Sequence, residues 1–151
     1  MSINDDVELL RRIPMFAKVE AAKLKLLAFT SERVTYDAGQ ELFHQGDMAD
    51  AAYIIVDGDV EVLVDTPRGP LAVATLGRNE FVGDIGVLCD IPRTATVKAA
   101  TRVTTLKISK DLFFRMVTDF PAMGVEVMRV LAHRLEQTTA QLREARLRAG
   151  Q

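Results

Sequence analysis

One stretch of the chain, residues 81–97, carries residue types that could hold a small anion. It reads F-V-G-D-I-G-V-L-C-D-I-P-R-T-A-T-V. Gly83 and Gly86 let the backbone approach a ligand closely, and a short helix over residues 85–89 would point free N–H groups at it. Arg93 can add a charge-assisted contact to a phosphate held there. The stretch therefore predicts a phosphate-type anion site.

Asp84 is the unusual member of this stretch, because a carboxylate repels a neighbouring phosphate. Its expected partner is a sugar hydroxyl, since acidic residues bind ribose hydroxyls in dinucleotide sites. An isolated G-D-x-G or P-R-T-A would be interpreted as an ordinary surface loop with a solvated arginine. The two motifs in this order favour a ligand site instead.

This order of residues resembles the phosphate-binding cassette of the cyclic-nucleotide-binding domain family, roughly F-x-G-E-(L/I)-(A/G)-L, a loop, then (P)-R-(S/T)-A. The matching residues are Phe81, Gly83, Ile85, Gly86, Pro92, Arg93, Thr94 and Ala95. The family usually has Glu where this chain has Asp84, which is one methylene shorter. The resemblance implies phosphate on the N–H groups of Ile85 and Gly86 and on Arg93. It also implies that Asp84 bonds the ribose 2′-OH.

A second resemblance concerns the nucleotide base. Residues 132–139, A-H-R-L-E-Q-T-T, are similar to a helix of the catabolite activator protein subgroup. In that subgroup a Thr-Ser pair contacts adenine, one residue from each subunit, and Thr138 and Thr139 fall at that pair. In the family, Thr at the position of Thr94 is often found where guanine is accepted. Hydroxyls donate and accept, so neither base is excluded; the longer helix match favours cyclic AMP over cyclic GMP.

The elements before the cassette must position it. Apolar residues within residues 5–29 recur at helical spacing and are interrupted by Pro14, which predicts two short helices. From Arg33 the apolar period changes to two, in short runs separated by turn residues. With two more runs after the cassette these make about eight strands, the number in a jelly-roll. Glycines at three of the turns are expected to be structural: Gly39, Gly46 and Gly58.

The chain after the barrel is predicted to be helical. Ser109 would cap a short helix over residues 111–118, and Pro121 would begin a long helix running toward Arg148. Steps of three and four mark a heptad seam in that helix: Met128, Leu131, Leu135, Thr138, Leu142 and Ala145. Its first half can pack on the barrel. The second half extends beyond the barrel, which favours a parallel helix pair and hence a homodimer.

Together these patterns predict one mainly β domain over residues 1–151. Its expected fold is an eight-stranded jelly-roll β-barrel with a short cassette helix. The expected parts are N-terminal helices over 1–31, the barrel over 32–109 with its cassette at 81–95, and C-terminal helices over 110–151.

Composition limits the possible functions and compartments. A net charge of −2 argues against direct nucleic-acid binding by this chain. Cys89 is the one cysteine, so an internal disulfide is excluded, and its apolar neighbours predict a buried thiol. The acidic N-terminus and the absence of a long apolar run predict a cytoplasmic protein without a membrane span.

A jelly-roll could also be a metal-dependent enzyme, but the residues for one are missing. Such sites need several histidines and a carboxylate around one metal. Only His44 and His133 exist, in different predicted elements. We therefore expect no enzyme, no metal and no catalytic cofactor.

The sequence thus predicts a regulatory sensor domain for a 3′,5′-cyclic nucleotide. Occupancy would be relayed through the C-terminal helix to an effector protein or domain whose identity the sequence does not give. The alternative is a ligand-free barrel that serves as a dimerisation or protein-interaction scaffold, for which Asp84 in place of Glu is the best support.

Overall fold

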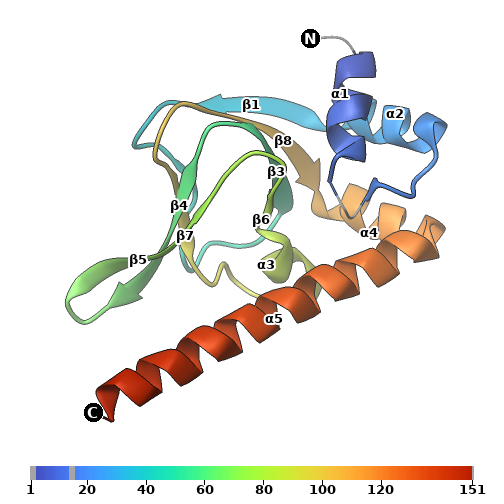
Figure 1. The fold of residues 1–151 in the computed structure, drawn as a ribbon. Helices are drawn as coiled ribbons and strands as arrows, with labels where there is room; N and C mark the ends of the chain where they lie inside the picture. The colour runs from blue at the N-terminus through green and yellow to red at the C-terminus, as the bar shows by residue number, and fades with distance from the viewer. Residues whose placement is uncertain (1–2, 14–15, 151) are drawn as a thin grey trace.

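The computed structural model describes residues 3–13 and 16–150, without the side chains of residues 3, 4, 84 and 85. Five helices and eight strands are described within it (Figure 1). The helices are α1 (Ile3–Arg11), α2 (Ala21–Thr30), α3 (Asp84–Cys89), α4 (Lys110–Asp119) and α5 (Pro121–Ala149). The strands are β1 (Glu32–Tyr36), β2 (Glu41–Phe43), β3 (Ala51–Asp57), β4 (Val60–Thr66), β5 (Gly69–Leu76), β6 (Phe81–Val82), β7 (Thr96–Ala99) and β8 (Val103–Ser109). The two predicted N-terminal helices are confirmed, whereas Pro14, predicted to separate them, lies outside the described residues.

The strands form two four-stranded antiparallel sheets, ordered β1-β8-β3-β6 and β2-β7-β4-β5. The predicted number of strands and the jelly-roll arrangement are confirmed. The predicted β-barrel is not closed, because no ladder in the described part of the chain joins one sheet to the other. Strands β2 and β6, at sheet edges, have three and two residues and so offer few groups for such a ladder.

Strand β3 joins the two halves of the core because both of its faces are buried. Its run A-A-Y-I-I-V alternates between two apolar clusters. Tyr53 and Ile55 pack between the sheets, with residues of β4, β7 and β8. Ile54 and Val56 pack on the other side, with α1, α2, α4 and α5. The continuous apolar run thus reflects a strand covered by the second sheet on one face and by helices on the other.

The two C-terminal helices begin where the sequence predicts. Ser109 caps α4 by accepting a hydrogen bond from the N–H of Leu112 at 3.2 Å, and Pro121 opens α5. Early α5 packs on the core through Met123 and Val127. Further on, the helix continues beneath the sheets toward the β4–β5 hairpin (Figure 1), and all its residues from 135 to 149 are exposed.

Cys89 does not fit the sequence prediction of a buried thiol. It is the last residue of α3 and is exposed. The short helix turns Gly86 and Val87 inward, so its final residue faces solvent. Among the described helices, none is both long and apolar enough to cross a lipid bilayer.

Two turn glycines provide a matched test of this packing. Gly58 has φ +93°, and a Cβ there would lie 2.3 Å from the carbonyl oxygen of Arg102. Gly39 has nearly the same φ, +92°, with no atom within 4 Å of such a Cβ. We expect Gly39→Ala to cost about 1–2 kcal/mol of unfolding free energy through its backbone angle alone. Gly58→Ala should cost at least about 1 kcal/mol more because of the added clash.

Urea unfolding of the two variants and the parent measures this difference directly. Equal losses of stability in the two variants would show that the turn at residue 58 shifts freely, contrary to the packing described above.

Candidate ligand-binding site

A cavity of about 410 Å³ lies where the cassette, the β4–β5 hairpin and α5 meet. This volume is in the range of roughly 300–1,000 Å³ that is typical of small-ligand sites. The hairpin wall is apolar, with Val62, Val73, Ala74 and Leu76. The structure brings six of the predicted site residues to the cavity: Gly83, Gly86, Arg93, Thr94, Ala95 and Thr138.

Arg93 is a charged residue of the cavity wall, and its side chain is tied to three other segments. The residue is only 3% exposed. Its Nη1 donates to the carbonyl oxygen of Gly83 at 2.9 Å, and its Nη2 donates to that of Ala51 at 2.6 Å. The same Nη2 lies 3.6 Å from a carboxylate oxygen of Asp50. The guanidinium also lies 4.0 Å above the centre of the Phe43 ring, a cation–π arrangement.

One donor of Arg93 is not satisfied by these contacts. Its Nε is buried and has no hydrogen-bond partner within the described part of the chain. Burial lowers the pKa of Arg93 from its ordinary value, but a guanidinium stays charged at neutral pH. A buried donor without an acceptor is unfavourable by about 1–3 kcal/mol.

The two cassette glycines make room for this arginine and its surroundings. Gly83 has φ +82°, and a Cβ there would lie 2.7 Å from Nη1 of Arg93. A Cβ on Gly86 would lie 2.7 Å from the Cβ of Ala49. Sequence reasoning explained both glycines by the approach of a ligand. The structure shows that packing within the protein already requires them.

The three remaining predicted site residues, Asp84, Ile85 and Thr139, lie on helices α3 and α5. Asp84 and Ile85 begin α3, with Gly83 as its N-cap residue, and their side chains lie outside the described part. On α5, Thr138 lines the cavity but Thr139 does not. One residue corresponds to about 100° around a helix, and this step turns Thr139 away from the side of α5 that Gln137 and Thr138 present to the cavity.

Sequence reasoning missed Arg134, which ties α5 to the cassette. Its Nη2 donates to the carbonyl oxygen of Phe81 at 2.7 Å, and its side chain lines the cavity. The signal was present, because Arg134 precedes Thr138 by four residues and so lies on the same helix face. Phe43 and Asp50 were also missed, and nothing near them in the sequence points to Arg93.

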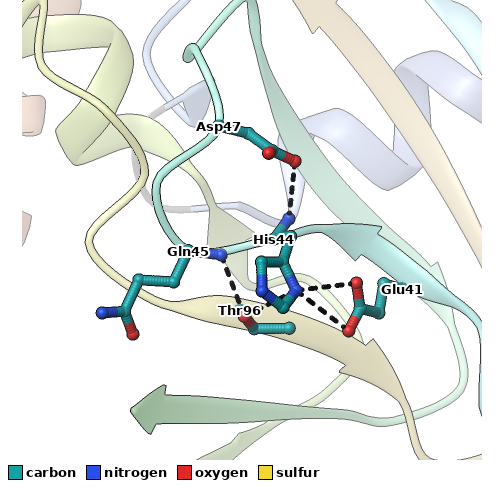
Figure 2. Close-up of polar contacts among 5 residues, drawn as sticks. All are labelled: Glu41, His44, Gln45, Asp47 and Thr96. Carbon is teal, nitrogen blue, oxygen red and sulfur yellow. Dashed lines mark hydrogen bonds and ion pairs between the residues drawn. The ribbon is translucent and has the colours of Figure 1, made fainter.

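A polar cluster around His44 holds the turn between β2 and β3 against the start of β7, the strand that follows the cassette (Figure 2). The Nδ1 atom of His44 lies 3.0 Å from a carboxylate oxygen of Glu41 and 3.4 Å from the hydroxyl of Thr96. The N–H of Gln45 donates to that hydroxyl at 2.9 Å. Two backbone hydrogen bonds then join the turn to Arg93. The N–H of Gly46 donates to the carbonyl oxygen of Arg93 at 2.9 Å, and the N–H of Arg93 donates to the carbonyl oxygen of Asp47 at 2.8 Å. The cluster therefore positions the backbone of the cassette arginine.

Comparison with known proteins identifies the family to which this fold belongs. The profile of the family described as "Cyclic nucleotide-binding domain" matches residues 33–120. The sensor domain of the transcriptional regulator DNR from Pseudomonas aeruginosa has the same fold, with a TM-score of 0.80 and 23% identity over 91% of this chain and 93% of that one. The chain belongs to the cyclic nucleotide-binding domain family.

Two curated relatives show the proteins in which similar segments occur. A CRP-like cAMP-activated global transcriptional regulator of Mycobacterium tuberculosis is 28% identical over 136 residues, 89% of this chain and 61% of the regulator. The lysophospholipase nte1 of Neosartorya fischeri is 31% identical over 108 residues, 71% of this chain and 7% of that protein. The chain therefore spans less than two thirds of either relative.

The His44 cluster predicts a pH effect. A hydrogen bond and the charge of Glu41 raise the pKa of His44 above its usual value. A pKa raised by folding adds stability that is complete below the unfolded-state pKa of about 6.5 and is lost as the pH rises through the folded pKa. An NMR titration should therefore give an elevated pKa for His44, and Glu41→Gln should return it toward 6.5.

A distant carboxylate serves as the control for this titration. Glu144 lies on α5, paired with Arg148, so Glu144→Gln should leave the His44 titration unchanged. An unshifted His44 in the parent would contradict the contacts drawn in Figure 2.

Proposed function

We propose that this chain is a sensor domain that binds a 3′,5′-cyclic nucleotide in the cavity, with cyclic AMP preferred to cyclic GMP. The observation that carries the proposal is Arg93, a buried cation with one unsatisfied donor at the wall of a small-ligand cavity. Membership in the cyclic nucleotide-binding domain family supports the ligand class.

The proposed pose follows from the chemistry of the walls. The cyclic phosphate lies at Arg93 and at the N–H groups of Ile85 and Gly86, and the ribose 2′-OH bonds Asp84. The base extends along the apolar wall of the hairpin, between Thr94 and Thr138, which both line the cavity. Thr139, which faces elsewhere in its own chain, is proposed to reach the base bound by a second copy.

We propose that occupancy is relayed by displacement of the helices after β8. Lys110, the first residue of α4, forms an ion pair with Asp90 at the end of the cassette helix. Its N–H also donates to the carbonyl of Asp50, whose side chain meets Arg93. A ligand that shifts Arg93 would disturb both links and so the start of α4. The effector would be a separate protein or a further domain.

Binding without catalysis is part of the proposal. Members of this family are known for regulatory binding, and the match to the lysophospholipase covers only 7% of that protein. Catalytic activity in such a relative is not assigned to this chain. The walls of the cavity offer groups suited to holding a nucleotide.

The alternative function, a dimerisation scaffold without a ligand, also has support. The seam of α5 leaves Leu135 68% exposed and Leu142 57% exposed, and Arg93 already bonds two carbonyls. Thermal unfolding with and without cyclic AMP separates the two functions. A sensor gains about 2.7 kcal/mol with ligand at a hundred times its dissociation constant, whereas a scaffold gains nothing.

The site assignment is tested by Arg93→Lys, which keeps the charge but loses the planar fork of donors. We expect calorimetry to show cyclic AMP binding weakened about tenfold to hundredfold, since a hydrogen bond to a charged group is worth about 1.5–3 kcal/mol. Arg78→Lys is the matched control, because Arg78 donates to the carbonyl of Val56 at 3.2 Å and does not line the cavity. A folded Arg93→Lys variant with the affinity of the parent would refute the assignment.

The proposed homodimer is tested on the α5 seam. Charged replacements at exposed apolar positions of a helix pair face each other and repel, so Leu135→Glu with Leu142→Glu should give monomers in sedimentation. Leu147→Glu is a useful comparison, since Leu147 is equally exposed but lies off the seam. A parent chain that sediments as a monomer with cyclic AMP present would show that α5 does not pair.

A further inference from the structure

The face of α5 that lines the cavity is polar, and this polarity points to a reader of the base. Arg134, Gln137, Thr138 and Gln141 line the cavity at spacings of three, four and seven, so they lie on one side of the helix. The opposite wall is the apolar β4–β5 hairpin. A planar heterocycle fits between such walls, with its faces on the apolar side chains and its polar edge toward the helix.

Two of these four residues, Gln137 and Gln141, suit recognition of the adenine edge that carries the 6-amino group and N7. Arg134 already donates to the carbonyl of Phe81, and Thr138 has a single hydroxyl that donates or accepts equally well. A glutamine amide presents a donor and an acceptor side by side in one plane. That pair matches the 6-amino donor and N7 acceptor of adenine, whereas guanine offers two acceptors, O6 and N7, at the same places.

The two glutamines differ in whether another side chain of α5 holds the amide. Nε2 of Gln137 lies 3.3 Å from Nε2 of His133, one helical turn earlier, so its amide is held in place. Gln141 makes no hydrogen bond with another described residue and lies about 6 Å further along the helix. His133 itself does not line the cavity. It is therefore a positioning residue for Gln137 rather than a ligand contact.

We propose that Gln137 and Gln141 are the residues that select adenine over guanine in this cavity. The inference rests on the proposed function, because it assumes that a cyclic nucleotide occupies the site. It goes beyond the predicted base contacts, which were limited to Thr94, Thr138 and Thr139. Specificity in this chain would then depend on carboxamides of α5 instead of on hydroxyls alone.

The experiment compares three probes: cyclic AMP, cyclic GMP and the 3′,5′-cyclic phosphate of purine riboside, which lacks the 6-amino group. Calorimetry is run on the parent and on Gln137→Ala, Gln141→Ala and the double variant. Glu136→Ala is the control, since Glu136 is an exposed neighbour on α5 that does not line the cavity. All three substituted positions are exposed on the helix, where alanine is well tolerated.

The parent should bind cyclic AMP about five- to a hundredfold more tightly than the other two probes, the discrimination typical of a bidentate amide–adenine pair. The double variant should bind all three within about twofold of one another. Its affinity for the purine riboside probe, which keeps N7 but lacks the 6-amino group, should fall less than its affinity for cyclic AMP. Glu136→Ala should keep the full preference. His133→Ala should lower the ratio of cyclic AMP to cyclic GMP affinity, because it frees the amide of Gln137.

Two failures can be told apart. If the parent binds none of the three probes, the proposed function fails, and the inference fails with it. If the parent binds them but the double variant keeps the parent's preference, the glutamines do not read the base, and the proposed function stands without them.

Discussion

The structure of the site depends on one buried guanidinium. Arg93 bonds the carbonyls of Gly83 and Ala51, lies over Phe43 and meets Asp50, so a single side chain joins the cassette, β2 and β3. Burying a charge is unfavourable unless it is paired and hydrogen-bonded, and the chain meets this demand largely with backbone carbonyls. Gly83 must be a glycine because any larger residue would displace this group. The conformation of the cassette and the charge of the cavity are consequently one feature, and neither can change without the other.

The contrast between the two halves of α5 follows from where the core ends. Met123 and Val127 pack on the same cluster as the helices of the N-terminal segment, which fixes the first half of the helix. After Leu131 no buried residue remains on α5, and the contact of Arg134 with the cassette carbonyl becomes a principal link to the body of the protein. A segment with few buried apolar contacts opens at low free energy. The second half of α5 is therefore the part of the molecule whose position a ligand could most readily alter.

Features set by local rules were predicted well from the sequence. Period-two runs located the strands, Ser109 and Pro121 located the helix starts, and the spacing of Gly83, Gly86 and Arg93 selected residues that line the cavity. Features that depend on residues far apart in the sequence were not predicted. Nothing local shows that the barrel stays open, that Cys89 is exposed, or that Phe43 and Asp50 converge on Arg93 across some forty or fifty residues. Burial of an arginine is itself contrary to the usual behaviour of that residue type, so only the fold could reveal it.

The polar groups of the cavity belong to two parts of the molecule, the sheets with their cassette and helix α5. This division explains how ligand binding could change the position of α5. A ligand shifts an equilibrium only by the difference between its affinities for the two states. Contacts to Arg93 alone are made within the sheet body, so a free phosphate would gain little from a change in the position of α5. Gln137, Thr138 and Gln141 belong to the helix, and contacts from them to a base exist only when the helix lies over the cavity. Under the proposed function, the phosphate end of a nucleotide would supply affinity, whereas the base end would supply the differential contact that holds α5 in place. Two nucleotides with identical phosphates would thus share the contacts to Arg93 and differ, in affinity as well as in signal, through their contacts to α5.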